Sequence, residues 1–195
     1  MEIAASLKGS VICDSWAGLP FTFEPERYMG NWYGIMHAKN QPFQSDAWTC
    51  SQASYTDLNA EDGTFRVYNS SEDRFYGIRF GVHGDAKYPA DTIAEFGQGQ
   101  MFVTFFDAPF FDTPNYQIID TDYETYSVVY ACHEDDMQYL WFLARTPEIS
   151  DDLLNKMIET ATEALPNFDW DNEIADKQNV DRCRYIQDVE NPIVF

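Results

Sequence analysis

The chain has 195 residues, of which 33 are acidic and 12 are basic, so its formal charge at neutral pH is −21. Such a charge argues against binding to nucleic acid or to anionic membrane surfaces, because both would repel the chain. The length fits one domain over residues 1–195, and no apolar stretch is long enough to predict a transmembrane segment.

The first residues lack a basic region followed by a long apolar core, so we do not expect a signal peptide there. The chain is then either intracellular or the mature form of a secreted protein with an added methionine. Four widely spaced cysteines, Cys13, Cys50, Cys132 and Cys183, favour the secreted form, since disulfides form in oxidising compartments. Spacing alone leaves three pairings open, and four reduced thiols in a cytosolic protein are the alternative.

Short β-forming segments follow one another through most of the chain, separated by turn signals such as Asp62-Gly63. The eight predicted strands cover residues 27–38, 49–58, 64–71, 74–82, 100–106, 116–122, 126–133 and 137–144. Mostly short connections predict an antiparallel up-and-down meander. Eight strands can close into a barrel with room for one small ligand, so we expect an all-β barrel over residues 27–145.

The hydrophobic period changes after the last strand. Ser150 is a good N-cap, apolar residues recur at helical spacing, and Pro166 ends the pattern. This predicts one amphipathic α-helix over residues 150–165, packed against the outside of the barrel. An irregular tail over residues 166–195, which contains Cys183, follows the helix.

Alternation along the strands assigns side chains to the two faces of the sheet, with Arg66, Arg79 and Thr104 on the outer face. The predicted inward set is Phe65, Val67, Asn69, Tyr76, Ile78, Phe80, Val82, Met101, Val103, Phe105, Tyr139, Trp141 and Leu143. An aromatic lining with a few polar groups is typical of a site for a mainly hydrophobic ligand. The alternative is a barrel filled with side chains.

Three segments together carry a family resemblance. Gly30 and Trp32 open the first strand, a Thr-Asp-Tyr turn begins at Thr121, and Arg145 ends the last strand. In this order and at these distances, they resemble the signature of the lipocalin family, which binds small hydrophobic molecules in a cup-shaped barrel. Within the family, the apolipoprotein D-like, bilin-binding and crustacyanin lipocalins are the most similar groups.

Two further stretches support these groups. Residues 121–132 resemble the apolipoprotein D-like sequences, and residues 40–44, followed by Cys50, are similar to the crustacyanin loop after the first strand. The resemblance implies the disulfides Cys13–Cys132 and Cys50–Cys183. It also implies a structural role for Trp32, which plugs the closed end of the barrel beneath the guanidinium of Arg145.

The resemblance further implies a set of ligand contacts, namely Tyr55, Asn69, Phe105 and Trp141. Ser71 departs from the apolipoprotein D-like pattern, which has an acid at this position. The ligand contacts implied by the resemblance therefore support a hydrophobic ligand without identifying it.

Several isolated signals have two interpretations each. Asn69-Ser70-Ser71 matches a glycosylation pattern, but a mid-strand position favours an inward amide. Phe110 and Phe111 stand in an expected loop, where they form either an exposed contact or a cover on the barrel. His37, His83 and His133 lack ligand spacing, so no metal site is predicted, although a cavity histidine can hold haem.

No catalytic motif is present, and we expect a binding protein rather than an enzyme. The predicted function is transport or storage of a carotenoid, bilin, retinoid or fatty acid, in a secreted protein that needs no other cofactor. With a carotenoid or bilin bound, the protein would be coloured. The prediction also allows a homo-oligomer. The alternatives are an isomerase-type lipocalin enzyme with a free thiol, and a solid barrel that serves as an interaction subunit.

Overall fold

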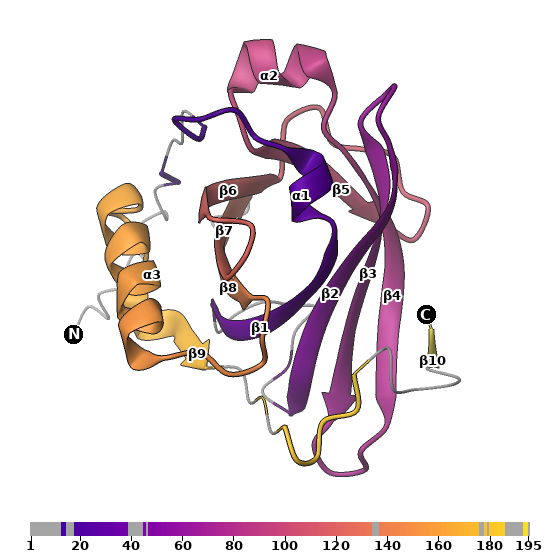
Figure 1. The fold of residues 1–195 in the computed structure, drawn as a ribbon, viewed down its shortest axis with the longest axis vertical. Coiled ribbons are helices and arrows are strands. Elements are labelled where there is room, and N and C mark those ends of the chain that lie inside the picture. The colour runs from indigo at the N-terminus through magenta and orange to yellow at the C-terminus, as the bar shows by residue number, and fades with distance from the viewer. Residues whose placement is uncertain are drawn as a thin grey trace, which may run out of the picture.

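A computed structural model describes residues 13–14, 18–38, 45, 47–133, 137–175, 178, 180–185 and 193–194. The barrel strands are β1 (Gly30–Ala38), β2 (Trp48–Asn59), β3 (Thr64–Asp73), β4 (Arg79–Lys87), β5 (Gln100–Phe105), β6 (Tyr116–Thr121), β7 (Tyr126–His133) and β8 (Met137–Ala144). Each strand pairs antiparallel with the next one in sequence, and β8 pairs with β1. The predicted closed antiparallel barrel of eight strands is therefore confirmed (Figure 1).

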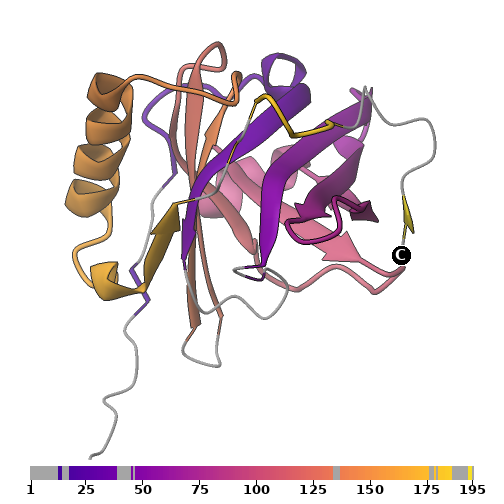
Figure 2. The same ribbon diagram turned by 90° about the horizontal axis from the view of Figure 1, so that it is seen from below.

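The remaining elements decorate the barrel. They are α1 (Pro25–Tyr28), α2 (Ala90–Phe96), α3 (Asp151–Ala164), a 3-10 turn (Trp170–Asn172), β9 (Glu173–Ala175) and β10 (Ile193–Val194). β9 extends the sheet beside β1 (Figure 2), and β10 runs parallel to β4. The sequence analysis did not predict α2, because its seven residues are too few to show a helical period.

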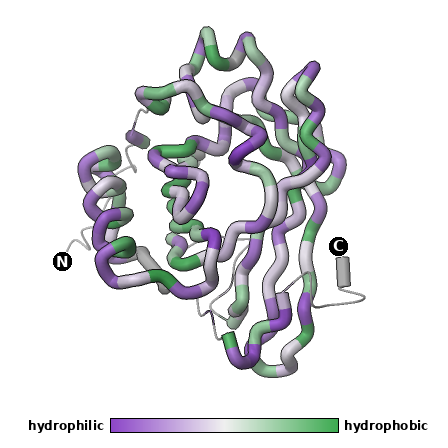
Figure 3. The backbone as a smooth tube through the Cα atoms, viewed as in Figure 1, coloured by the Kyte–Doolittle hydropathy of each residue, from purple (hydrophilic) through white to green (hydrophobic). Residues whose placement is uncertain are grey.

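The predicted outer helix is confirmed as α3. Ser150 Oγ accepts a hydrogen bond from the N–H of Leu153 at 3.2 Å, which caps the first turn. Met157, Ala161 and Leu165 are fully buried against the outward side chains of β6–β8. Figure 3 shows that these strands carry more of the hydrophobic residues than the tall β2–β4 wall, since they are covered on both faces.

The predicted fourth strand is wrong at both ends. Residues 74–78 form a turn in which Asp73 Oδ1 accepts the N–H groups of Phe75 and Tyr76 at 2.9 and 2.8 Å. β4 therefore begins at Arg79 and continues through residues 84–87, which lie beyond the end of the predicted strand 74–82. Because the turn is rich in β-forming residues, the sequence pattern predicted a strand there and did not reveal the Asx turn at Asp73.

Both disulfides implied by the resemblance are present. The Cα atoms are 5.7 Å apart in Cys13–Cys132 and 5.5 Å apart in Cys50–Cys183. The four cysteines of the chain are thus all paired. Among the described elements, no helix is both long and apolar enough to cross a membrane.

Candidate functional site

Trp32 and Arg145 close one end of the barrel, as the resemblance implied. The indole of Trp32 is fully buried, and the guanidinium carbon of Arg145 lies 3.6 Å from the centroid of its ring. The same guanidinium donates to the backbone carbonyls of Arg27, Asn31 and Tyr123 at 2.8, 2.9 and 2.9 Å. One side chain therefore joins the segments before β1, within β1 and after β6, while it covers the plug.

The Thr-Asp-Tyr turn presents one of those carbonyls to Arg145. Thr121 Oγ1 accepts from the N–H of Tyr123 at 3.0 Å and donates to the carbonyl of Tyr126 at 2.7 Å. Asp122 Oδ1 accepts the N–H groups of residues 124–126 at 2.7–3.1 Å. These bonds hold Tyr123 at φ 68°, a conformation that a residue without such support avoids.

A chain of hydroxyl groups forms the floor of the barrel interior above the plug. Tyr28 Oη lies 2.9 Å from Ser127 Oγ and 3.2 Å from Tyr116 Oη, and Tyr116 Oη lies 2.9 Å from Tyr55 Oη. Burial raises the pKa of Tyr28 to about 12, and it also raises the pKa of Tyr55 and of Tyr116. The floor is therefore a set of neutral hydroxyl groups.

The wall above this floor is aromatic and incompletely packed. Val103, Phe105, Tyr116 and Trp141 are turned inward, yet each keeps part of its surface exposed. The ring of Trp141 stacks on Tyr116 at 6.4 Å and on Tyr139 at 5.9 Å, with interplanar angles of 18° and 20°. These side chains point into a closed barrel, so solvent reaches part of its inner surface at this level.

The lining continues upward on β3 and β4. Asn69, Phe80 and Val82 occupy inward positions, Asn69 is exposed, and Phe80 and Val82 are half-buried. β5 pairs only with residues 84–87 of β4, so the part of β4 that carries Phe80 and Val82 extends beyond the end of β5. Asn69 therefore stands on the inner face of the barrel, as predicted.

The strand register shows which of the predicted ligand-contact residues lie on the inner face of the barrel. Those on inward positions are Tyr55, Phe65, Val67, Asn69, Phe80, Met101, Val103, Phe105, Tyr139 and Trp141. The inward placement of Tyr76 and Ile78 is wrong, because both lie in the exposed β3–β4 turn, with 82% and 47% of their surface accessible. Contact of any of these residues with a ligand stays a prediction.

The sequence analysis missed three polar members of the floor. Tyr28 belongs to the short helix α1, and Ser127 is a small residue on a strand otherwise rich in valine. Tyr116 shares its inward face with Ile118, so alternation along the predicted strand 116–122 was a signal that could have found it.

Charged groups are confined to the outside of the barrel wall. Arg66 is exposed and pairs with Asp85 at 2.7 Å, as its predicted outer position requires. The inward positions between floor and rim carry no Asp, Glu, Lys or Arg in the described strands. In a chain of charge −21, this partition leaves a neutral interior.

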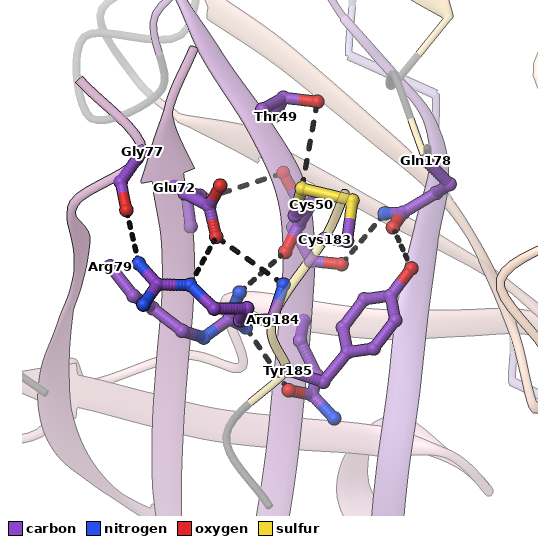
Figure 4. Close-up of a disulfide and its surroundings, with 12 residues drawn as sticks. Thr49, Cys50, Glu72, Gly77, Arg79, Gln178, Cys183, Arg184 and Tyr185 are labelled. Carbon is purple, nitrogen blue, oxygen red and sulfur yellow. Dashed lines mark hydrogen bonds and ion pairs between the residues drawn. A yellow bond between two sulfur atoms is a disulfide. The ribbon is translucent and has the colours of Figure 1, made fainter. Parts of the chain in front are cut away.

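The tail covers the outer face of β2–β4 (Figure 4). Cys183 is bonded to Cys50, and Arg184 lies 3.9 Å from the buried carboxylate of Glu72. Beneath the tail, Arg79 is buried and donates to the carbonyl of Cys50 at 3.1 Å and to Ser70 Oγ at 2.7 Å. Its predicted outward position is therefore correct, although the tail and not water covers it.

A side chain of the tail also bridges the top of the wall. Gln178 Nε2 donates to the carbonyls of Gly34 and Ser51 at 2.8 and 2.9 Å. These carbonyls belong to β1 and β2 above the last residues that pair directly, Tyr33 and Gln52. The tail thus seals a gap between the two strands.

The two phenylalanines predicted in a loop differ in their surroundings. Phe110 folds back onto Lys87, whose Nζ lies 4.8 Å from its ring, whereas Phe111 is half exposed. Residues 40–44 lie outside the described part of the chain. Within that part, no group of three His, Cys, Asp or Glu side chains is placed to hold a metal ion.

Comparison with known proteins decides the family. A family model described as "Lipocalin-like domain" matches residues 23–172, which include the plug, the turn and the whole barrel. The chain belongs to the lipocalin family. Rat (Rattus norvegicus) apolipoprotein D is 33% identical over 132 residues, a match that covers 64% of this chain and 62% of the length of that protein.

Two solved lipocalin structures show the same fold. Insecticyanin from the tobacco hornworm Manduca sexta superposes with a TM-score of 0.65 at 19% identity and covers 94% of this chain and 96% of its own. Lobster apocrustacyanin A1 superposes with a TM-score of 0.61 at 18% identity over 80% of each chain. At these identities, the two structures show the shared fold.

We predict that Arg145→Lys destabilises this lipocalin by about 2–4 kcal/mol, because a lysine cannot bond three carbonyls while it stacks on Trp32. Urea unfolding followed by tryptophan fluorescence measures the change. Arg66→Lys, at an exposed ion pair, is the matched control and should cost less than about 0.5 kcal/mol. Equal losses in both variants would contradict the role given to Arg145.

A second prediction concerns Asp122. Partial burial raises its pKa, but the hydrogen bonds from Thr125 and from the N–H groups of residues 124–126 outweigh this and lower it below the ordinary 3.8. A depressed pKa in the folded state adds stability at pH above 3.8, and this contribution is lost as the pH falls through the folded pKa.

Asp122→Asn should therefore lower the Tm by about 2–4 °C at pH 6, the shift that about 1 kcal/mol produces in a domain of this size. The difference between the two proteins should shrink as the pH falls below 3.8. Differential scanning calorimetry between pH 6 and about pH 2.5 measures it, and a constant difference would refute the assignment.

Proposed function

We propose that this lipocalin binds and carries a small hydrophobic molecule in the hollow between the tyrosine floor and the open end of the barrel. The observation that carries the proposal is the set of inward side chains that remain partly exposed, above all Val103, Phe105 and Trp141. Burial of this apolar surface by a ligand contributes roughly 25 cal/mol per Å². A solid interaction subunit would have packed the same side chains against one another.

The shape of the lining favours an extended conjugated ligand. The rings of Tyr116, Trp141 and Tyr139 lie nearly parallel along one wall. A flat polyene or tetrapyrrole can stack along such a row, whereas a fatty acid chain gains less from it. We therefore favour a carotenoid or bilin, and a coloured protein, over a retinoid or a fatty acid.

Secretion is part of the same proposal. The two disulfides close loops of 119 and 133 residues, and such bonds persist in oxidising compartments. The isomerase-type alternative has no support, because its chemistry needs a free thiol and all four cysteines are paired. The molecule would act as a carrier without another cofactor.

A substitution that fills the hollow tests this function. Val103→Trp places an indole among Phe105, Tyr116 and Trp141, and we expect it to weaken binding of the neutral dye Nile red at least about tenfold. Fluorescence titration gives the affinity, and circular dichroism checks that the barrel is folded.

Thr56→Trp is the control, since it adds the same indole at an exposed outer position of β2. It should leave the Nile red affinity unchanged. If the dye fails to bind the unaltered protein, or binds Val103→Trp with equal affinity, the carrier function is wrong.

A further inference from the structure

The turn between β3 and β4 presents a group of apolar side chains to solvent. Phe75 keeps 68% of its surface accessible, and Tyr76 and Ile78 are exposed as well. The turn is not a loose segment, because Asp73 Oδ1 accepts the N–H groups of Phe75 and Tyr76. Adjacent exposed apolar side chains on an ordered turn are typical of an interaction site.

The exposed charges of this turn are positive. The guanidinium of Arg74 lies 4.7 Å from the centroid of the Phe75 ring, and Arg184 of the tail donates to the backbone of the turn. The two acids beside them are already engaged, since Glu72 is buried next to Arg184 and Asp73 accepts backbone N–H groups. The turn is therefore aromatic and locally basic, on a chain whose charge is −21.

A pocket of about 280 Å³ lies at the closed end of the barrel, between α1, the β2–β3 hairpin and the start of α2. Its base is apolar, because Phe23 and Tyr88 are buried there and Leu58 and Ile93 are half-buried. Pockets that enclose a small-molecule ligand measure roughly 300–1,000 Å³. This pocket is smaller, and its size suits one aromatic side chain.

The two walls of the pocket are joined by their backbones. The N–H of Tyr88 donates to the carbonyl of Gly63 at 2.9 Å. Gly63 has φ 71°, and a Cβ atom there would lie 2.3 Å from the carbonyl oxygen of Tyr88. A glycine is therefore needed for this close approach, which holds the hairpin and the segment before α2 in place.

The rim of the pocket is acidic. Glu26, Glu61 and Asp62 line it, and none of its described lining residues is a lysine or an arginine. Within the described part of the chain, Glu26 and Glu61 form no ion pair. An apolar base with a negative rim is complementary to an aromatic turn with positive charges.

We propose that the β3–β4 turn of one copy docks into this pocket of a second copy, so that chains associate head to tail. An aromatic ring of the turn fills the apolar base, and Arg74 and Arg184 face the carboxylates of Glu26 and Glu61. One chain cannot join its own turn to its own pocket, because α2 and the β3–β4 turn lie at opposite ends of the molecule (Figure 1). The inference is independent of the carrier function, since the barrel interior takes no part in the contact.

The contact should be weak and should allow repeated addition. One turn in one pocket buries less than the roughly 1,200 Å² of a stable interface. The negative charges that lie far from the contact repel each other, but salt at physiological ionic strength screens them beyond about 8 Å. Because the contact joins two different surfaces, each added copy leaves one turn and one pocket free.

Sedimentation velocity in about 0.15 M salt measures this association. Between about 10 and 500 μM protein, we expect the weight-average sedimentation coefficient to rise, with half-association near about 100 μM. Tyr76→Ser should weaken the association about tenfold, because it removes an aromatic anchor. Phe106→Ser is the matched control, since it removes another ring that is 74% exposed, and it should associate like the unaltered protein.

The pocket is tested separately with Glu26→Lys/Glu61→Lys, which should also weaken association about tenfold. Glu159→Lys/Glu163→Lys makes the same change of charge on the exposed face of α3 and should associate at least as tightly as the unaltered protein. Circular dichroism checks that each variant is folded.

A mixture of the turn variant and the pocket variant gives the sharpest result. Tyr76→Ser keeps an intact pocket and Glu26→Lys/Glu61→Lys keeps an intact turn, so the two should form a heterodimer that adds no further copies. The proposal is overturned if the unaltered chain stays monomeric over the whole concentration range, if Phe106→Ser weakens association as much as Tyr76→Ser, or if the mixture does not associate.

Discussion

The stack of the Arg145 guanidinium on the Trp32 indole is the contact on which the rest of the structure depends. It closes the barrel at one end, since the guanidinium also holds carbonyls of three segments that would otherwise separate. A barrel of eight strands has a narrow interior, and a plug at one end leaves the remaining space open only toward the other end. The tyrosine floor forms above the plug because Trp32 Nε1 holds the carbonyl of Tyr28 at 2.9 Å and the two rings pack at 5.0 Å.

The second constraint is the separation of charge from the interior. The barrel belongs to a chain with 33 acidic residues, yet its inward strand positions are apolar or neutral. Charged side chains stay outside because desolvation of an unpaired charge costs several kcal/mol. Where a charged residue is buried on the outer face, as at Glu72 and Arg79, the tail supplies its partners or covers it. The high charge therefore lies on the outside of the barrel, and the inward positions of the described strands carry none of it.

Much of this architecture was predictable from the sequence, and the failures have physical causes. The periods of two and of 3.6 located β7, β8 and α3. The family resemblance predicted the contact between Trp32 and Arg145. It also predicted the pairing of the four cysteines, for which their spacing alone left three alternatives. Alternation failed at Tyr76 and Ile78, because one aspartate turned a β-like segment into a tight turn. The hydroxyl chain was not predictable, since it joins Tyr28 of a short helix to three strands that are distant in sequence.

The most direct test of the central claim is native mass spectrometry of the protein isolated from its natural source, followed by identification of any small molecule released from it. We expect one mainly apolar molecule per chain. Isolation of the chain without any bound molecule under gentle conditions would contradict an interior that serves a hydrophobic ligand.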